Sequence, residues 1–289
     1  MKTPQSRKLV SAIIITAAVI AVGVALTIWY FNSLPQPEGV GRPNNTVVPE
    51  RLDPMRNTTS HDSDSIWSGY VAHGQTFIAV EGKVRVPSVK CTNEDQSFTA
   101  WVGFGGYEVA TVEQTGFAIT CHNAMEYAKY SAIDGVWYYS WALMYGSGPS
   151  KTFSVEVRPG DEMLYRVERE GESYHLTVKN LTLNQTDTTT EECHQLDSAS
   201  AEGMRSCAID MVEWIVERAG HAAMLDFGKV HLYDNKATTE DGKTMRLDEL
   251  PNTRIHMANS TDTMTETGLI QDDGSFDIIW KGTGVAGKL

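Results

Sequence analysis

The chain has 289 residues, and its 37 acidic against 24 basic side chains give a formal charge of −13. Such an excess of acids disfavours nucleic acid and anionic lipid headgroups as partners. The length allows one or two domains, and because no nucleotide loop or other cofactor motif occurs, the sequence predicts no cofactor.

The first predicted element is a membrane anchor at residues 9–31, an uncharged apolar run that follows Lys2, Arg7 and Lys8 and ends in aromatic residues. At ~1.5 Å per residue, a helix of this length is ~34 Å long, enough to cross a bilayer. The basic flank predicts that residues 1–8 are a cytoplasmic stub and that the rest of the chain is extracellular. The alternative is a cleaved signal peptide and a secreted protein, although signal peptides usually have a shorter apolar region.

Residues 32–63 are rich in Pro, Asn, Ser and charged residues and lack apolar periodicity, which predicts a disordered linker. From residue 64 to residue 289, short runs alternate apolar with polar residues, and Gly, Asn, Asp and Pro separate them. The clearest runs are 76–87, 98–102, 136–145, 153–157, 163–168, 173–178 and 229–233. This spacing predicts one antiparallel β-sandwich domain over residues 64–289.

The run at 211–219 allows a short helix, but its β-branched and aromatic residues favour a strand. In a strand, Glu213 and Glu217 lie on one face, while Trp214 and the valines beside it lie on the other. A face of Trp and Val belongs in a core. The two glutamates are therefore expected on the open face of the sheet.

Four cysteines follow the predicted anchor, an even number that predicts two disulfides in an external domain, with three possible pairings. They are Cys91, Cys121, Cys193 and Cys207. No metal-binding spacing of Cys or His occurs, so no metal site is predicted. Glycosylation sequons begin at Asn44, Asn57, Asn180, Asn184 and Asn259.

Several blocks, in this order, resemble the glutamic peptidases (eqolisins). They are Trp67-Ser68-Gly69-Tyr70, Trp101-Val102-Gly103, Gln114-Thr115-Gly116, Glu213-Trp214-Ile215-Val216-Glu217, Asp226-Phe227-Gly228 and the closing 273–280. The resemblance covers about 66–280. It implies a jelly-roll, concanavalin A-like sandwich and an acid-acting endopeptidase whose substrate is a polypeptide.

The resemblance further implies a catalytic pair of Gln114 and Glu217. Hydrolysis by water needs a base, an oxyanion donor and an acid. Glu217 would be the base and then the acid, whereas the amide of Gln114 would position the water and stabilise the oxyanion. Glu213, ~13 Å from Glu217 along the strand, is too far away to act in the same pair and is expected at the rim, in contact with substrate.

Four further residues are predicted to bind substrate: Trp101, Gly103, Tyr139 and Trp141. Three others depart from the family pattern, because Ala118, Gly105 and Ser140 stand where the family commonly has the acidic residues that surround the catalytic pair. Without those acids the activity of the site is open. The alternative function is a catalytically decayed binding module for peptides or glycans at the cell surface.

Overall fold

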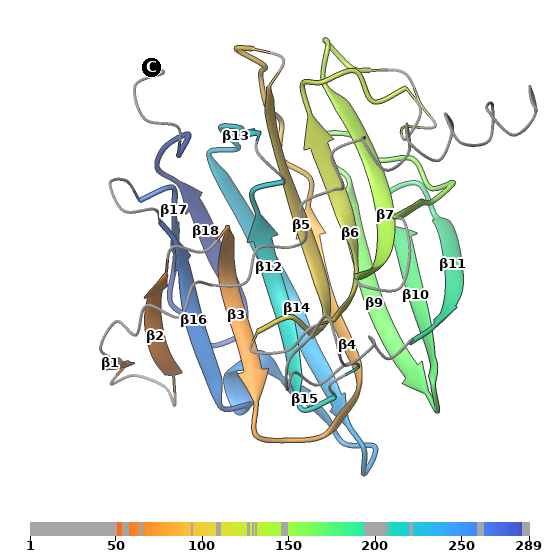
Figure 1. The fold of residues 1–289 in the computed structure, drawn as a ribbon, viewed down its shortest axis with the longest axis vertical. Helices are drawn as coiled ribbons and strands as arrows, with labels where there is room; N and C mark the ends of the chain where they lie inside the picture. The colour runs from red at the N-terminus through yellow and green to blue at the C-terminus, as the bar shows by residue number, and fades with distance from the viewer. Residues whose placement is uncertain are drawn as a thin grey trace, which may run out of the picture. The chain divides into compact units, whose positions relative to one another are not determined.

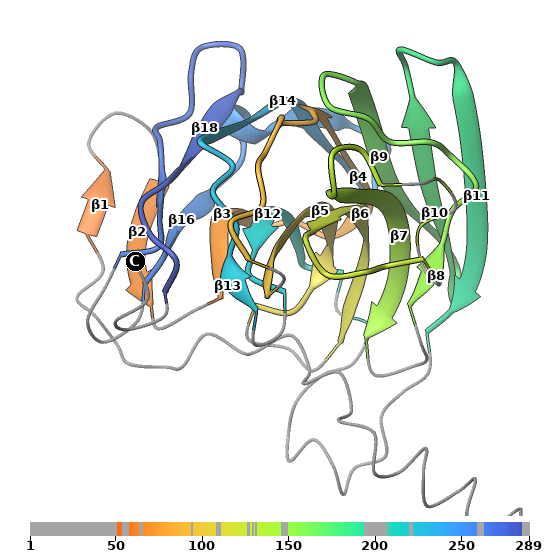
Figure 2. The same cartoon turned by 90° about the horizontal axis from the view of Figure 1, so that it is seen from above.

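The computed structural model describes residues 51–53, 58–63, 66–93, 95–107, 111–125, 128, 130, 132–145, 150–193, 207, 209–219, 222–258 and 263–284. All of them belong to the unit Val40–Leu289. The described chain is all β, apart from the single 3₁₀ turn η1 (Leu247–Glu249). Two mainly antiparallel sheets face each other, which confirms the predicted β-sandwich (Figures 1 and 2).

The first sheet, called sheet A here, carries the strand of the two glutamates at its centre. Its order is β1 (Arg51–Asp53), β2 (Thr58–Ser63), β16 (Asn252–Met257), β3 (Trp67–His73), β12 (Met211–Glu217), β5 (Gln96–Gly105), β6 (Val112–Thr120), β7 (Trp137–Tyr145) and β8 (Lys151–Thr152). The short β13 (Ala223–Met224) pairs with β5.

The second sheet, sheet B, forms the opposite layer of the sandwich (Figure 2). Its order is β11 (Gln185–Glu192), β10 (Ser173–Asn180), β9 (Glu162–Glu170), β4 (Phe77–Arg85), β14 (Lys229–Thr239), β18 (Phe276–Trp280) and β17 (Thr265–Thr267). The short β15 (Thr244–Arg246) pairs with β14.

The main core lies between the sheets and is built by alternate residues of each strand. On β12 the core side is Val212, Trp214 and Val216, as predicted, and all three are fully buried. The Nε1 of Trp214 donates to the carbonyl oxygen of Glu81 on β4 at 2.8 Å. This bond satisfies the buried indole and joins the two layers.

Two predictions about the chain before β3 have different outcomes. The linker prediction for 32–63 is wrong for β1 and β2, because β2 pairs in parallel with β16 and so extends sheet A. Such pairing uses backbone groups and needs no apolar periodicity in the sequence. The predicted anchor at 9–31 lies outside the described residues; within them, no helix is long and apolar enough to cross a membrane.

The run at 153–157 is not a strand, although its alternate residues Phe153, Val155 and Val157 are buried in the core as a strand would bury them. Side chains of sheet B accept two of its backbone N–H groups. Asp187 accepts from Ser154 at 2.8 Å, and Gln185 accepts from Glu156 at 2.8 Å. The alternation of apolar residues at 153–157 therefore predicted which side chains are buried, but not that side chains, rather than a neighbouring strand, accept these backbone hydrogen bonds.

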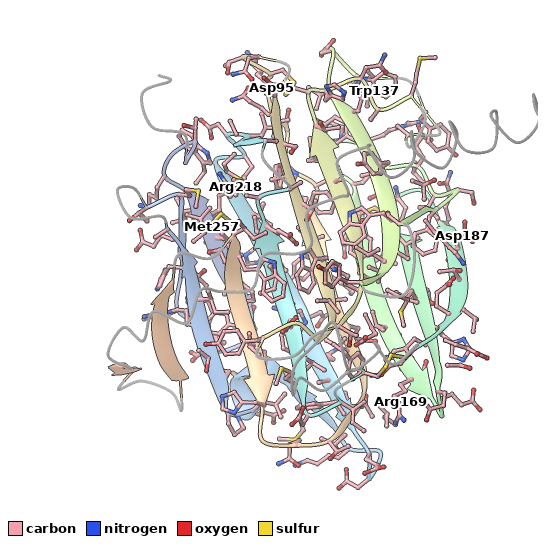
Figure 3. All side chains as sticks on the ribbon, in the orientation of Figure 1. Asp95, Trp137, Arg169, Asp187, Arg218 and Met257 are labelled. Atoms are coloured by element: carbon pink, nitrogen blue, oxygen red, sulfur yellow. A yellow bond between two sulfur atoms is a disulfide. The ribbon has the colours of Figure 1, made fainter. Side chains whose placement is uncertain are left out.

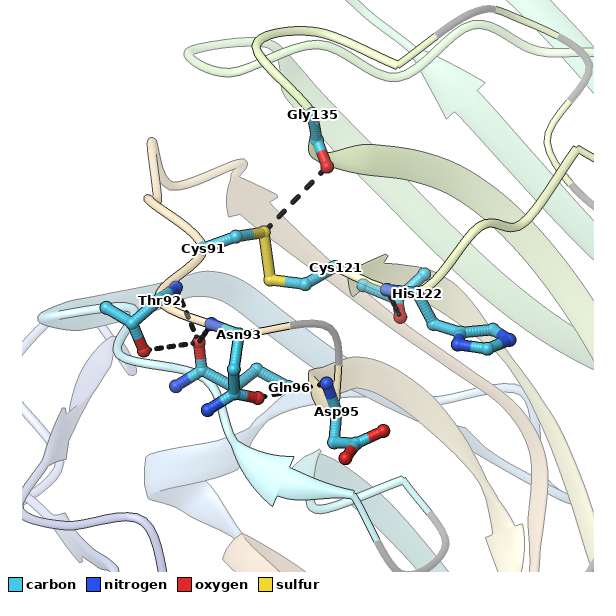
Figure 4. The surroundings of a disulfide bond; sticks show 9 residues. Cys91, Thr92, Asn93, Asp95, Gln96, Cys121, His122 and Gly135 are labelled. Atoms are coloured by element: carbon cyan, nitrogen blue, oxygen red, sulfur yellow. Dashed lines mark hydrogen bonds between the residues drawn. A yellow bond between two sulfur atoms is a disulfide. The ribbon is translucent and has the colours of Figure 1, made fainter. Parts of the chain in front are cut away.

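Both predicted disulfides form, and they pair neighbouring cysteines in the sequence: Cys91 with Cys121 and Cys193 with Cys207. The first ties the segment before β5 to the end of β6 (Figure 4). Beside it, the side-chain oxygen of Gln96 accepts from the backbone N–H and hydroxyl of Thr92 and from the N–H of Asn93. The start of β5 is thus fixed by a covalent bond and a local hydrogen-bond network.

Candidate active site

The predicted catalytic and substrate-binding residues come together on the face of sheet A that points away from sheet B, called the site face here. Antiparallel register places residues of β12, β5 and β6 in rows across the sheet. The rows are Glu213, Gly103 and Gln114; then Ile215, Trp101 and Gly116; then Glu217, Thr99 and Ala118. Gln114 and Glu217, from strands about a hundred residues apart in the sequence, therefore share one face.

The rows run along the sheet from the end where β12 finishes. Arg218, which follows Glu217 at the end of β12, lies at the same end of the sheet as Asp95, which precedes β5 (Figure 3). The Glu217 row is therefore nearest that end, and the Glu213 row lies farther along the sheet toward the opposite end.

An aromatic cluster supports the site face. The rings of Trp67 and Trp101 meet edge to face, with centroids 5.0 Å apart and an interplanar angle of 77°. Ile215 and Trp141 pack in the same cluster. Gly116 leaves the space for Trp101, because a Cβ at this position would lie 2.1 Å from the oxygen of Ala100 and 2.6 Å from the Cβ of Trp101. Only glycine therefore fits at this position of the Gln-Thr-Gly block, directly opposite Trp101 on β5.

Glu217 is the carboxyl on this face whose surroundings best suit a general base. It is 7% exposed, and its Oε2 accepts a hydrogen bond from the Nε1 of Trp101 at 2.8 Å. Burial raises the pKa of Glu217 to about 7, while the indole N–H groups of Trp101 and Trp67 act in the opposite direction. A carboxyl with a pKa near 7 exchanges protons readily at mildly acidic to neutral pH, as a general base and acid must.

Gln114 has a buried amide without a hydrogen-bond partner. The residue is 1% exposed, and neither its oxygen nor its nitrogen bonds to any described residue. Buried amides are nearly always paired, so an unpaired one is typical of a position that binds water or a ligand. The neighbouring Thr115 points the other way and donates to the carbonyl oxygen of Trp141 at 2.9 Å, which fixes β6 against β7.

Trp101 lies between these two residues on a diagonal of the sheet. Each diagonal step between strands is about 7–8 Å, so the Cβ atoms of Gln114 and Glu217 are about 15 Å apart. Their side chains make no direct hydrogen bond. That separation is larger than the ~13 Å that excluded Glu213 from the pair, so Gln114 and Glu217 share a water only if both side chains lean toward each other over Trp101. That shared water stays a prediction.

Glu213 is more deeply buried than expected. It is 0% exposed, so it is not at the rim, and the backbone N–H of Tyr107 donates to its Oε1 at 3.2 Å. Burial raises its pKa well above the ordinary value, and the nearby acids Glu113 and Glu217 raise it further. The segment after β5, which carries Tyr107, covers this carboxyl, and the sequence alone did not show that cover.

The other predicted substrate-binding residues also lie on the site face. Gly103 is directly between Glu213 and Gln114, while Tyr139 and Trp141 are on β7, opposite Ala118 and Gly116. They share the face with the candidate catalytic residues, but Trp141 is buried and Tyr139 is half-buried. Their contact with substrate stays a prediction.

The three departures from the family pattern have different positions. Ala118 belongs to the aromatic cluster and lies in the row of Glu217, with Thr99 between the two. Gly105 has a φ of 73°, a left-handed conformation that an acidic residue adopts only with strain. Ser140 points into the core and lies 3.1 Å from the hydroxyl of Tyr165. The expectation that Ser140 belongs to the surroundings of the catalytic pair is therefore wrong, because strand alternation turns it to the opposite face.

Glu113, which was not among the predicted site residues, precedes Gln114 and points to the core side of β6. It is 1% exposed, and burial raises its pKa to about 8, against a hydrogen bond from Thr111. The alternation that places Gln114 on the site face already requires this neighbour to face inward. That alternation was the signal that could have revealed a buried acid.

Glu113 also lies near a pair of sulfur atoms. Its Oε1 is 3.9 Å from the Sγ of Cys193, and one ligand-type atom from each of Glu113, Cys193 and Cys207 lies within 4.8 Å of the others. Metals bind cysteine as the thiolate. Because these two cysteines form a disulfide, the cluster does not provide a metal site in this state.

Comparisons with known proteins agree on one family. The family model described as Peptidase A4 family matches residues 65–280. The chain is 29% identical over 216 residues to aspergillopepsin-2 of Aspergillus niger, an alignment that covers 66% of this chain and 70% of that protein.

Two solved structures have a similar fold. Scytalido-glutamic peptidase, solved with a peptide-based transition state analogue, has a TM-score of 0.57 at 20% identity and covers 74% of this chain and 98% of its own. SCP-B, a member of the eqolisin family solved with the tripeptide Ala-Ile-His, has a TM-score of 0.54 at 19% identity with the same coverage.

Proposed function

Because this chain belongs to the peptidase A4 family and is a glutamic endopeptidase, we propose that Glu217 and Gln114 are the residues that hydrolyse the peptide bond. One observation carries the assignment. Glu217 is a buried carboxyl held by the Nε1 of Trp101, and it shares the site face with the unpaired amide of Gln114.

The reaction follows from these two side chains and one water. The Glu217 carboxylate takes a proton from the water, whose oxygen attacks the carbonyl carbon of the substrate. The NH₂ group of Gln114 donates to the oxyanion that forms. Glu217 then gives its proton to the departing amine as the carbon–nitrogen bond breaks, which leaves an acid, an amine and the carboxylate restored.

Burial sets two conditions on this reaction. A substrate must reach residues that are 1% and 7% exposed, so the side chains packed over the face have to move on binding. They include Ile66, Tyr107 and Tyr139, which are only partly buried. The pKa of Glu217 of about 7 places the base form at a higher pH than an ordinary carboxyl would, so the acid-side limb of kcat/KM should lie nearer neutrality than the family resemblance implies.

The test is proteolysis of a denatured protein by wild type and three variants over a range of pH. Glu217→Gln keeps the size but removes the titrating proton, so the rate should fall by at least ~10²–10⁴. Gln114→Ala should cost ~10²–10³ through the lost oxyanion donor. Glu213→Gln is the matched control on the same strand and face, and it should cost much less.

Three outcomes would change the assignment. If Glu217→Gln stays active while Glu213→Gln does not, the base is Glu213. If Gln114→Ala retains full activity, the amide has no role in the reaction. If wild type cleaves nothing at any pH, yet binds a peptide or glycan equally well with Glu217→Gln, the chain is a decayed binding module.

We further propose that residues 9–31 anchor the enzyme in a membrane, with residues 1–8 cytoplasmic and the sandwich extracellular. The proposal rests on the length of the apolar run and its basic flank. N-terminal sequencing of the native protein tests it. A mature terminus near residues 26 to 33 would mean that the run is a cleaved signal peptide and that the enzyme is secreted.

A further inference from the structure

Two unpaired polar groups face the same space on either side of Gly103. Register places Glu213 and Gln114 in one row, separated only by this glycine, so their Cα atoms are ~10 Å apart across two strand spacings. Both side chains are fully buried. The Oε2 of Glu213 and both amide atoms of Gln114 have no hydrogen-bond partner among the described residues. Gly103 places no side chain between them, and a Cβ here would lie 2.7 Å from the carbonyl oxygen of Glu113 and 3.0 Å from the Cβ of Gln114.

The surroundings of Glu213 favour the neutral carboxylic acid. Its Oε1 accepts the N–H of Tyr107, so Oε1 acts as the carbonyl oxygen and the hydrogen belongs on Oε2. The neighbours that face it across the sheet, Val71 on β3 and Gly103 on β5, carry no charge. The charged groups that act on it are Glu113 and Glu217, both acids. An ionised Glu213 would have one unpaired oxygen and repulsion from like charges.

We propose that Glu213 is a second oxyanion donor: its Oε2–H and the NH₂ group of Gln114 bind the substrate carbonyl oxygen from both sides of Gly103. This inference rests on the proposed function of Gln114. A protonated carboxyl in an apolar site is a strong donor to a developing negative charge, and it needs no reorganisation when that charge forms. No proton is transferred by Glu213, which remains neutral before and after the reaction.

The proposal gives the two glutamates of β12 opposite protonation states. Glu217 has the indole of Trp101 to stabilise its carboxylate and so acts as the base. Glu213 has one backbone donor and works only while protonated. Ionisation of Glu213 at higher pH would remove a donor and place a negative charge beside the oxyanion, so the rate should fall by at least the ~10²–10³-fold expected for a lost donor. Neighbouring carboxyls whose pKa values are pushed apart commonly divide base and acid roles in this way.

The experiment compares kcat, KM and the pH dependence of kcat in Glu213→Gln and Glu213→Leu. Glu213→Gln retains a neutral N–H donor, so its kcat should stay within ~10-fold of wild type. Its pH profile of kcat should lack the fall at alkaline pH that ionisation of Glu213 causes. Glu213→Leu removes the donor, so its kcat should fall ~10²–10³-fold with little change in KM. Glu113→Gln, a buried acid on the opposite face, is the control, because its initial rate should keep an alkaline limb, moved only to lower pH as the loss of this acid lowers the pKa of Glu213.

Two results would overturn the proposal: a kcat of Glu213→Leu equal to that of wild type, or an alkaline limb in Glu213→Gln identical to that of wild type. If Glu213→Leu does not fold, the pH profile of Glu213→Gln still decides. The proposed function fails separately, through an active Glu217→Gln or an active Gln114→Ala. An inactive Glu217→Gln beside a fully active Glu213→Leu would therefore reject only the role of Glu213.

Discussion

Replacing Glu113 with Gln should make the free energy of unfolding fall less as the pH rises from 4.5 to 7. Glu113 lies between the two sheets, opposite Phe104 on β5, and is 1% exposed. Burial raises its pKa to about 8 from the ordinary value of 4.5. Folding therefore favours the protonated form.

The sign and size of the effect follow from linkage. A carboxyl with a raised pKa in the folded state stabilises fully below 4.5, and this contribution is lost as the pH rises toward 8. At pH 7 the loss is about 3 kcal/mol, since ~2.5 pH units above the unfolded pKa are worth ~1.4 kcal/mol each. The free energy of unfolding of a domain is about 5–15 kcal/mol, so this one side chain would remove a substantial part of the stability.

Urea unfolding of the full chain, with disulfides intact, measures the effect at pH 4.5 and pH 7. Wild type and Glu113→Gln should agree within ~1 kcal/mol at pH 4.5, because Gln keeps the size and a polar contact with Thr111. At pH 7 the variant should be more stable by about 3 kcal/mol. Equal losses of stability in the two proteins between these pH values would refute the reasoning.

Three other predictions address the site and the surface. Trp101→Phe removes the donor to Glu217, so the pKa of that carboxyl should rise and the acid limb of kcat/KM should move up by about one to two pH units in a pH–rate profile. Gly103→Ala would place a Cβ 2.7 Å from the carbonyl oxygen of Glu113 and 3.0 Å from the Cβ of Gln114, so thermal unfolding should show a loss of stability of about 1–3 kcal/mol. In a glycosylating host, Asn184 should carry a glycan and Asn180 should not. Asn184 is exposed, whereas Asn180 is buried and its Nδ2 donates two hydrogen bonds. Mass spectrometry before and after glycosidase treatment checks both sites.

The alternation of residues in a strand was sufficient to predict how β12 is oriented. Trp214 and its flanking valines are apolar and had to be buried in a core, so the two glutamates had to share the other face. The same rule, applied to β7, would have placed Ser140 inside, where it lies beside Tyr165. The error came from following the family pattern at that position instead of strand parity.

The burial of the site face could not be predicted in the same way. Parity says which residues share a face, but not what covers it, and Glu213 is covered by the backbone of Tyr107. The pairing of β2 with β16 was equally out of reach, because it depends on main-chain groups that every sequence has. The pattern of apolar and polar side chains predicts which face of a strand is buried. The cover of Glu213 and the pairing of β2 with β16 depend instead on backbone contacts, which that pattern does not encode.

The position of β12 also determines when the enzyme becomes active as it folds. This strand is inserted between β3 and β5, which precede it by more than a hundred residues, and the bond between Trp101 and Glu217 joins residues 116 apart in the sequence. Contacts of such long range close large loops and form late and slowly. A partly folded chain therefore presents cleavable backbone but has not yet assembled the proposed catalytic pair. A newly made molecule therefore cannot cleave another chain until its own central sheet is complete.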